Sequence, residues 1–124
     1  MINMLLVLAG GGIVALCRYG TSLLAVKLFG SGFPWGTLIV NLVGCFLIGM
    51  AFTLADQRGI ITPAVRLFFI TGFLGGLTTF SSFGLESANL AANGALSSSL
   101  LNIALNNIAG LGLVFAGMWA ARLI

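Results

Sequence analysis

Residues 72–83 read GFLGGLTTFSSF and lie inside an apolar stretch that is long enough to cross a membrane. Three glycines fall within five residues, and two threonines and two serines follow them. Glycine destabilises a helix interior by about 1 kcal/mol relative to alanine. A break at mid-membrane is tolerated only where protein, water or an ion satisfies the exposed backbone groups. We therefore predict a membrane helix interrupted near its middle at an ion-related break; a glycine-packed kink is the alternative.

The composition of the whole chain is that of an integral membrane protein. Of its 124 residues, 60% are hydrophobic and only 6% are charged, whereas about 25% are charged in soluble domains. Histidine is absent and the only acids are Asp56 and Glu86, so the usual general base is missing and we expect no enzyme. Five basic residues against two acids give a net charge of +3, and so few charges cannot form a nucleic-acid patch.

Four apolar stretches can each cross a bilayer, which takes about 20 residues. They cover residues 4–29, 35–55, 65–90 and 100–121. The short connections contain glycine and proline, which are typical of turns. We predict a single all-α domain of four transmembrane helices over residues 1–124, the third of them interrupted. No Lys or Arg precedes the first stretch, so we do not expect it to be a cleaved signal peptide.

The orientation in the membrane is weakly specified by charge. Four spans place both termini on one side, together with Arg58, Arg66 and Arg122, while Lys27 lies on the other. By the positive-inside rule, this predicts cytoplasmic termini. Such a small bias also permits insertion in both orientations.

Four helices are few for enclosing a pathway, so we expect an oligomer. Gly72 and Gly76 form a small-xxx-small pair, which would support close contact between helices.

Cys17 and Cys45 lie inside spans, and we interpret both as buried small hydrophobic residues rather than as a disulfide or metal site.

Several polar side chains lie where lipid cannot satisfy them. Arg18 either extends to the headgroups or packs at a helix end, or it provides a positive charge at the vestibule of an anion pathway. Asn41 either forms interhelical hydrogen bonds or donates to an anion in a pore. The same two interpretations apply to Asn102, Asn106 and Asn107 in the fourth stretch.

Phe80 and Phe83 are three residues apart and share a helical face within the polar part of the third stretch. Phenylalanine in a membrane ordinarily faces lipid or packs. Aromatic rings have positive edges, however, and these edges can solvate an anion. Glu86, one turn further on, is either a helix-end carboxylate or part of a vestibule.

These segments resemble the fluoride channel family known as Fluc or CrcB, over all four stretches. GTLIVNLVG at 36–44 resembles its second-helix motif, and residues 72–83 resemble its highly specific third-helix signature. The glycine run at 10–12 leading to Arg18 resembles the first-helix motif more loosely, with Ala15 where a glycine is expected.

The resemblance implies an antiparallel homodimer of dual topology in the cell (inner) membrane, with two fluoride pores and a structural Na⁺ at the dimer centre. It implies that the backbone carbonyls of Gly75 and Thr78 hold the sodium. The implied fluoride path includes Phe80, Phe83, Asn41, Ser81, Thr79, Glu86 and, in the fourth helix, Asn106.

The resemblance further implies a passive channel that exports fluoride which has entered the cell as HF and ionised there. The main alternative is a small four-helix proton-coupled cation or multidrug exporter. Such an exporter needs a carboxylate deep in the membrane, and only Glu86, late in the third stretch, is available. A third class, a scaffold packed through glycines, explains Gly72 and Gly76 but not the polar residues.

Overall fold

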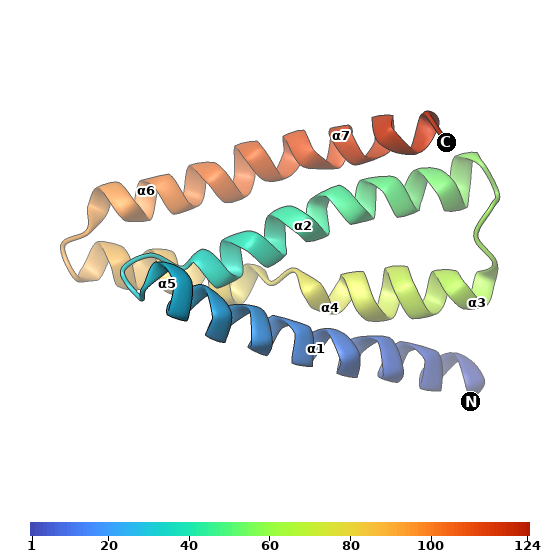
Figure 1. Ribbon diagram of the computed structural model, residues 1–124, viewed down its shortest axis with the longest axis horizontal. Helices are drawn as coiled ribbons and strands as arrows, with labels where there is room; N and C mark the ends of the chain where they lie inside the picture. The colour runs from blue at the N-terminus through green and yellow to red at the C-terminus, as the bar shows by residue number, and fades with distance from the viewer.

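The computed structural model describes residues 1–124, and all of its regular elements are helical (Figure 1). In chain order, with π-helical segments labelled η, these are α1 (Ile2–Phe29), α2 (Trp35–Phe52), η1 (Thr53–Gln57), α3 (Pro63–Arg66), η2 (Leu67–Leu74), α4 (Gly75–Leu77), α5 (Phe80–Ala92), α6 (Leu96–Ala104), η3 (Leu105–Ala109) and α7 (Gly110–Arg122). They combine into four helices long and apolar enough to span a membrane: Ile2–Phe29, Trp35–Gln57, Pro63–Ala92 and Leu96–Arg122. The prediction of an all-helical, multi-pass membrane protein is confirmed.

The membrane helices extend beyond the apolar stretches from which they are predicted. The third begins at Pro63 rather than at residue 65, because the Thr62 hydroxyl accepts a hydrogen bond from the Val65 N–H at 3.4 Å and caps the helix. Proline fits the first helical position, where its missing N–H breaks no helical bond. The fourth begins at Leu96, because its serine-rich first turn is helical without being apolar.

The two ends of the bundle carry different charges. Both termini and α3 lie at one end, and the loops at 30–34 and 93–95 lie at the other (Figure 1). At the terminal end, Arg66 forms an ion pair with Asp56, and the Arg58 side chain donates to the carbonyl of Arg122 at 3.3 Å. Lys27 lies in the last turn of α1, at the opposite end.

Thr78 and Thr79, within the third membrane helix, have extended backbone. Their φ and ψ angles are −85° and 137°, and −134° and 121°. Figure 1 shows this segment as a thin connection between α4 and α5. Thr79 donates its backbone N–H to the side chain of Asn41 instead of to the carbonyl of Gly75, its helical acceptor. Backbone groups here are therefore available to side chains or ions.

Glycines allow two pairs of helices to touch at their backbones. A β-carbon on Gly49 in α2 would lie 2.1 Å from the carbonyl oxygen of Val114 in α7. A β-carbon on Gly117 in α7 would lie 2.0 Å from the carbonyl oxygen of Phe46 in α2. Gly10 in α1 is equally close to η2, with a β-carbon 2.3 Å from the Phe68 carbonyl oxygen. Any larger side chain at these positions would force the helices apart.

The Gly72 and Gly76 pair packs inside the chain. A β-carbon on Gly72 would lie 2.9 Å from the Val7 carbonyl oxygen, and one on Gly76 would lie 2.7 Å from Val14 Cγ1. Both contacts are with α1 of the same chain. The expected close contact between helices is therefore present at this pair, and it lies within one chain.

The outer surface of the bundle is apolar, and only 20 of the 124 residues are buried. The small core cluster consists of Val14, Val40, Ala51, Leu74 and Leu77.

Cys17 and Cys45 are free thiols. Cys45 is half-buried but Cys17 is exposed on α1, so the expectation that both are buried is wrong for Cys17.

Candidate functional site

A cavity of about 390 Å³ lies among α2, η2, α4, α5 and η3, beside the extended segment at Thr78 and Thr79. We call it the central cavity. It is lined by Asn41, Gly44, Cys45, Ile48, Ile70, Leu74, Gly75, Thr78, Thr79, Phe80, Phe83, Asn106 and Asn107. The lining contains amides, hydroxyls and aromatic rings but no ionisable acid or base other than a thiol. It can therefore offer hydrogen-bond donors without a full positive charge.

A continuous hydrogen-bond network connects the polar side chains of three membrane helices. Thr79 N donates to Asn41 Oδ1 at 3.2 Å, and Asn41 Nδ2 donates to Asn106 Oδ1 at 2.8 Å. Asn106 Nδ2 donates to Asn102 Oδ1 at 2.9 Å and to the Asn102 carbonyl at 2.8 Å. Asn102 Nδ2 donates to Ser87 Oγ at 2.9 Å. We call these five residues the amide network.

The asparagines differ in which of the two interpretations they fit. Asn41 and Asn106 fit both, because they bond to each other between helices and also line the central cavity. Asn102 is 0% exposed and makes only interhelical and local bonds. Asn107 lines the cavity and donates to the carbonyl of Ile103 in its own helix at 2.8 Å. Asn106 and Asn107 belong to the π-helical segment η3, a conformation that is frequent at functional sites.

The rings of Phe80 and Phe83 meet edge to face, with centroids 5.5 Å apart and an interplanar angle of 64°. Both rings line the central cavity and also a second cavity of about 440 Å³ between α5 and α6. Phe83 is only 7% exposed, whereas Phe80 is 81% exposed. Phe83 is therefore held in place by its own chain, while Phe80 stands on the surface of the bundle.

Arg18 reaches inward to the extended segment rather than toward the headgroups. Its Nη1 donates to the Gly76 carbonyl and its Nη2 donates to Thr79 Oγ1, each at 3.3 Å. A cation is favourable at the carboxyl end of a helix, here the end of α4. The guanidinium group therefore connects α1 to Gly76, before the extended segment, and to Thr79 within it.

We expect Arg18→Lys to destabilise the protein, because an ammonium group cannot reach both acceptors that the planar fork reaches. Loss of one hydrogen bond from a charged donor corresponds to about 1.5–3 kcal/mol. The thermal unfolding midpoint in detergent measures the effect. Arg58→Lys, at an exposed position at the end of the bundle, is the matched control; an equal change in both variants would contradict the assignment.

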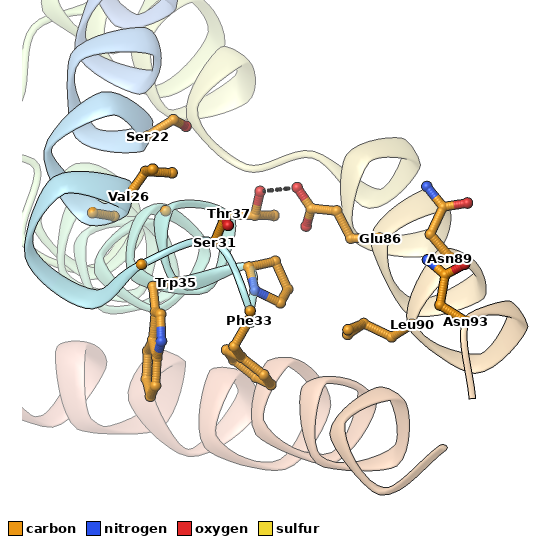
Figure 2. A pocket seen from close by; sticks show the side chains of 15 residues that line it. Ser22, Val26, Ser31, Phe33, Trp35, Thr37, Glu86, Asn89, Leu90 and Asn93 are labelled. Atoms are coloured by element: carbon orange, nitrogen blue, oxygen red, sulfur yellow. Dashed lines mark hydrogen bonds between the residues drawn. The ribbon is translucent and has the colours of Figure 1, made fainter. Parts of the chain in front are cut away.

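Glu86 lies in a different cavity of about 350 Å³, at the end of the bundle near the loop at 30–34. Figure 2 shows Thr37 and Glu86 facing each other, and Thr37 Oγ1 donates to Glu86 Oε1 at 2.7 Å. The other carboxylate oxygen, Oε2, is buried without a partner. We call this space the end cavity; Ser22, Asn89 and Asn93 also line it.

The structure gathers most of the predicted site residues but not all of them. Those that line the central cavity are Asn41, Gly75, Thr78, Thr79, Phe80, Phe83 and Asn106. Ser81 is exposed and does not line it. Glu86 lies in the end cavity, and Arg18 contacts the extended segment from α1.

Sequence reasoning did not single out Thr37, Ser87 and Ser99. Thr37 is four residues before Asn41, and Ser87 is four residues after Phe83, so each shares a helical face with a residue that was singled out. That spacing is the signal that could have found them. Ser99 Oγ donates to the Ser87 carbonyl at 2.7 Å, a contact that no spacing indicates.

The four spans, the uncharged donor-lined cavity and the extended segment between α4 and α5 define a small multi-pass membrane transport protein rather than an enzyme. A family model described as "CrcB-like protein, Camphor Resistance (CrcB)" matches residues 5–118. The chain belongs to the CrcB family, as the resemblance in its motifs indicates.

Proteins named "Fluoride-specific ion channel FluC" are similar to this chain over nearly its whole length. One from Agrobacterium fabrum is 44% identical over 122 residues, which cover 98% of each chain. One from Salinibacter ruber is 45% identical over 121 residues, covering 98% of this chain and 90% of the relative. One from Shewanella halifaxensis is 47% identical over 106 residues, covering 86% and 85%.

Proposed function

We propose that this protein is a fluoride-selective passive channel that lets cytoplasmic fluoride leave the cell down its electrochemical gradient. The observation that carries the proposal is the central cavity, where amide donors and two phenylalanine rings surround a space without a full charge. Donors and ring edges can replace the hydration of an anion without trapping it. The choice of fluoride is supported by the names of the relatives.

The residues of the path have different roles in this proposal. Asn41 gives one amide N–H to Asn106, and its second N–H donates to the anion. Phe80 and Phe83 present ring edges, and the hydroxyls of Thr79 and Ser81 lie along or beside the path. Glu86 and Thr37 line the vestibule at the end cavity.

A homodimer is part of the proposal, because one chain leaves the central cavity open. Phe80 is 81% exposed although its ring lines that cavity, and Gly75 and Thr78 beside it are also exposed. A second copy would close this wall. An antiparallel dimer of dual topology is compatible with the weak charge asymmetry of three arginines against one lysine.

We also propose that the carbonyls of Gly75 and Thr78 bind a structural sodium ion at the dimer centre. Carbonyl oxygens are suitable ligands for a hard cation. The Gly75 carbonyl lacks its helical partner, because the Thr79 N–H donates to Asn41 instead. Gly75 and Thr78 lie on the exposed side of the chain, where carbonyls of two copies could converge. The bound ion would neutralise these carbonyls and join the copies.

The exporter alternative receives no support from the position of Glu86. Its carboxylate is hydrogen-bonded to Thr37 and lies with loop residues at the end of the bundle. Proton-coupled exchange needs a carboxylate along the pathway inside the membrane, and the central cavity contains none.

Fluoride efflux from liposomes containing the purified protein tests the channel. We expect fast fluoride loss and no chloride loss when valinomycin provides charge balance through potassium. Phe80→Ile and Phe83→Ile should reduce the fluoride rate, because an aliphatic side chain has no positive ring edge. Phe115→Ile, at an exposed position of α7 outside both cavities, is the control. Absence of efflux from verified dimers would refute the channel.

A further inference from the structure

Two backbone groups, one that can only accept a hydrogen bond and one that can only donate, fix the direction of the hydrogen bonds between the amides of Asn41 and Asn106. A backbone carbonyl only accepts, so the Asn106 atom that lies 2.8 Å from the Asn102 carbonyl oxygen is Nδ2. A backbone N–H only donates, so the Asn41 atom that lies 3.2 Å from Thr79 N is Oδ1. The bond between them, from Asn41 Nδ2 to Asn106 Oδ1 at 2.8 Å, agrees with both ends. The orientation of both side-chain amides is therefore determined.

This direction leaves one amide hydrogen free at the central cavity. Asn106 Nδ2 has two acceptors, the side-chain and backbone oxygens of Asn102, and so uses both of its hydrogens. Asn41 Nδ2 has one acceptor, Asn106 Oδ1. Because Asn41 lines the cavity, its second N–H is the donor that the network presents there.

Asn102 supports this arrangement from outside the cavity. Its side chain is 0% exposed and does not line the central cavity. Both of its polar atoms are bonded, Nδ2 to Ser87 Oγ and Oδ1 to Asn106 Nδ2, each at 2.9 Å. Without Oδ1, the Asn102 carbonyl would still accept from Asn106 Nδ2, but one acceptor alone would hold the amide less tightly, and Asn41 would lose the fixed position of its partner.

We infer that Asn102 is a positioning residue: it fixes the Asn106 amide and thereby directs the free N–H of Asn41 into the central cavity. The inference rests on the proposed channel function for its effect on fluoride. Ser99 provides a matched comparison, because its Oγ also joins α6 to α5, through the Ser87 carbonyl at 2.7 Å. Ser99 is buried like Asn102, but its hydroxyl donates to a backbone carbonyl and not to a side-chain amide.

The test reconstitutes each variant at fewer than one channel per vesicle and measures the fluoride rate in active vesicles separately from the fraction of active vesicles. For Asn102→Leu we expect the rate per active vesicle to fall about tenfold or more, as for a misplaced donor. A purely structural defect would lower the active fraction and leave that rate unchanged. Ser99→Ala should keep the rate within about threefold, since its donor is outside the network.

A second readout does not depend on transport. The side-chain amide signals of Asn41, measured by NMR in isotope-labelled protein, should change in Asn102→Leu and stay unchanged in Ser99→Ala. If Asn102→Leu does not fold, Asn102→Ala removes the same side-chain acceptor without adding a larger apolar group, and the same results are expected.

An unchanged rate per active vesicle in the Asn102 variant, or an unchanged Asn41 signal, would overturn the inference. If the unmodified protein conducts no fluoride, the proposed function fails, and the Asn41 signal alone then decides whether Asn102 positions the amide.

Discussion

Replacing Asn41 with aspartate is expected to reduce fluoride efflux on the order of a hundredfold or more. The carboxylate keeps an acceptor for the Thr79 N–H. It replaces the amide group, which donates one N–H to Asn106 and presents the other to the cavity, with a negatively charged group. Two like charges about 4 Å apart repel by about 4 kcal/mol at an effective dielectric constant of 20, and each 1.4 kcal/mol is tenfold. Liposome efflux, normalised to the amount of reconstituted protein, measures the change.

The neighbouring amide cannot compensate for this substitution. Asn106 would have to turn its Nδ2 toward the new carboxylate, which would break both of its bonds to Asn102. Asn3→Asp, at an exposed position in the first turn of α1, adds the same charge away from the cavity and should leave efflux nearly unchanged. Fluoride efflux near the unmodified rate in Asn41→Asp would show that the anion does not pass this amide.

Replacing Gly117 with alanine is expected to abolish recovery of folded protein. The new β-carbon would lie 2.0 Å from the Phe46 carbonyl oxygen and 3.0 Å from Met50 N. Both atoms belong to the backbone of α2, so no side-chain rotation can relieve the overlap. Overpacking lowers the free energy of unfolding by about 1–3 kcal/mol where neighbouring side chains can shift. We expect a larger loss here, because the overlapping atoms belong to the backbones of two packed helices. Size-exclusion profiles and thermal unfolding in detergent measure the loss.

Gly112→Ala is the control on the same helix. Nothing lies within 4 Å of the position that its β-carbon would take, and alanine stabilises a helix by about 1 kcal/mol relative to glycine. The variant should therefore fold as well as the unmodified protein or better. Normal folding of Gly117→Ala would contradict the backbone contact between α2 and α7.

The sequence was sufficient for properties that depend on local pattern and length. The four spans follow from apolar runs matched to the thickness of a bilayer, and only their ends differ from the observed helices. Residues 36–44 and 72–83 were sufficient to indicate the CrcB family, which the family model and the relatives show. Asn41, Phe80, Phe83 and Asn106, named from their chemistry in a membrane, line one cavity.

The sequence was not sufficient for contacts between helices. The Gly72 and Gly76 pair packs against α1 of the same chain, because a small-residue pattern does not specify which helix fills the space. Arg18 could have extended to the headgroups, yet it bonds to Gly76 and Thr79. Asn102 shares a face with Asn106, but the spacing does not show that it is fully buried against Ser87.

The sequence by itself therefore determined the class of structure, the number of spans and the family, since these depend on hydrophobic length and local motifs. Only the tertiary structure decided which polar groups meet: Asn41 with Asn106, 65 residues apart, and Arg18 with Gly76, 58 residues apart. The physical reason is that a hydrogen bond between helices requires a particular rotation and register of each helix. Backbone contacts at Gly49, Gly117 and Gly10 fix that register.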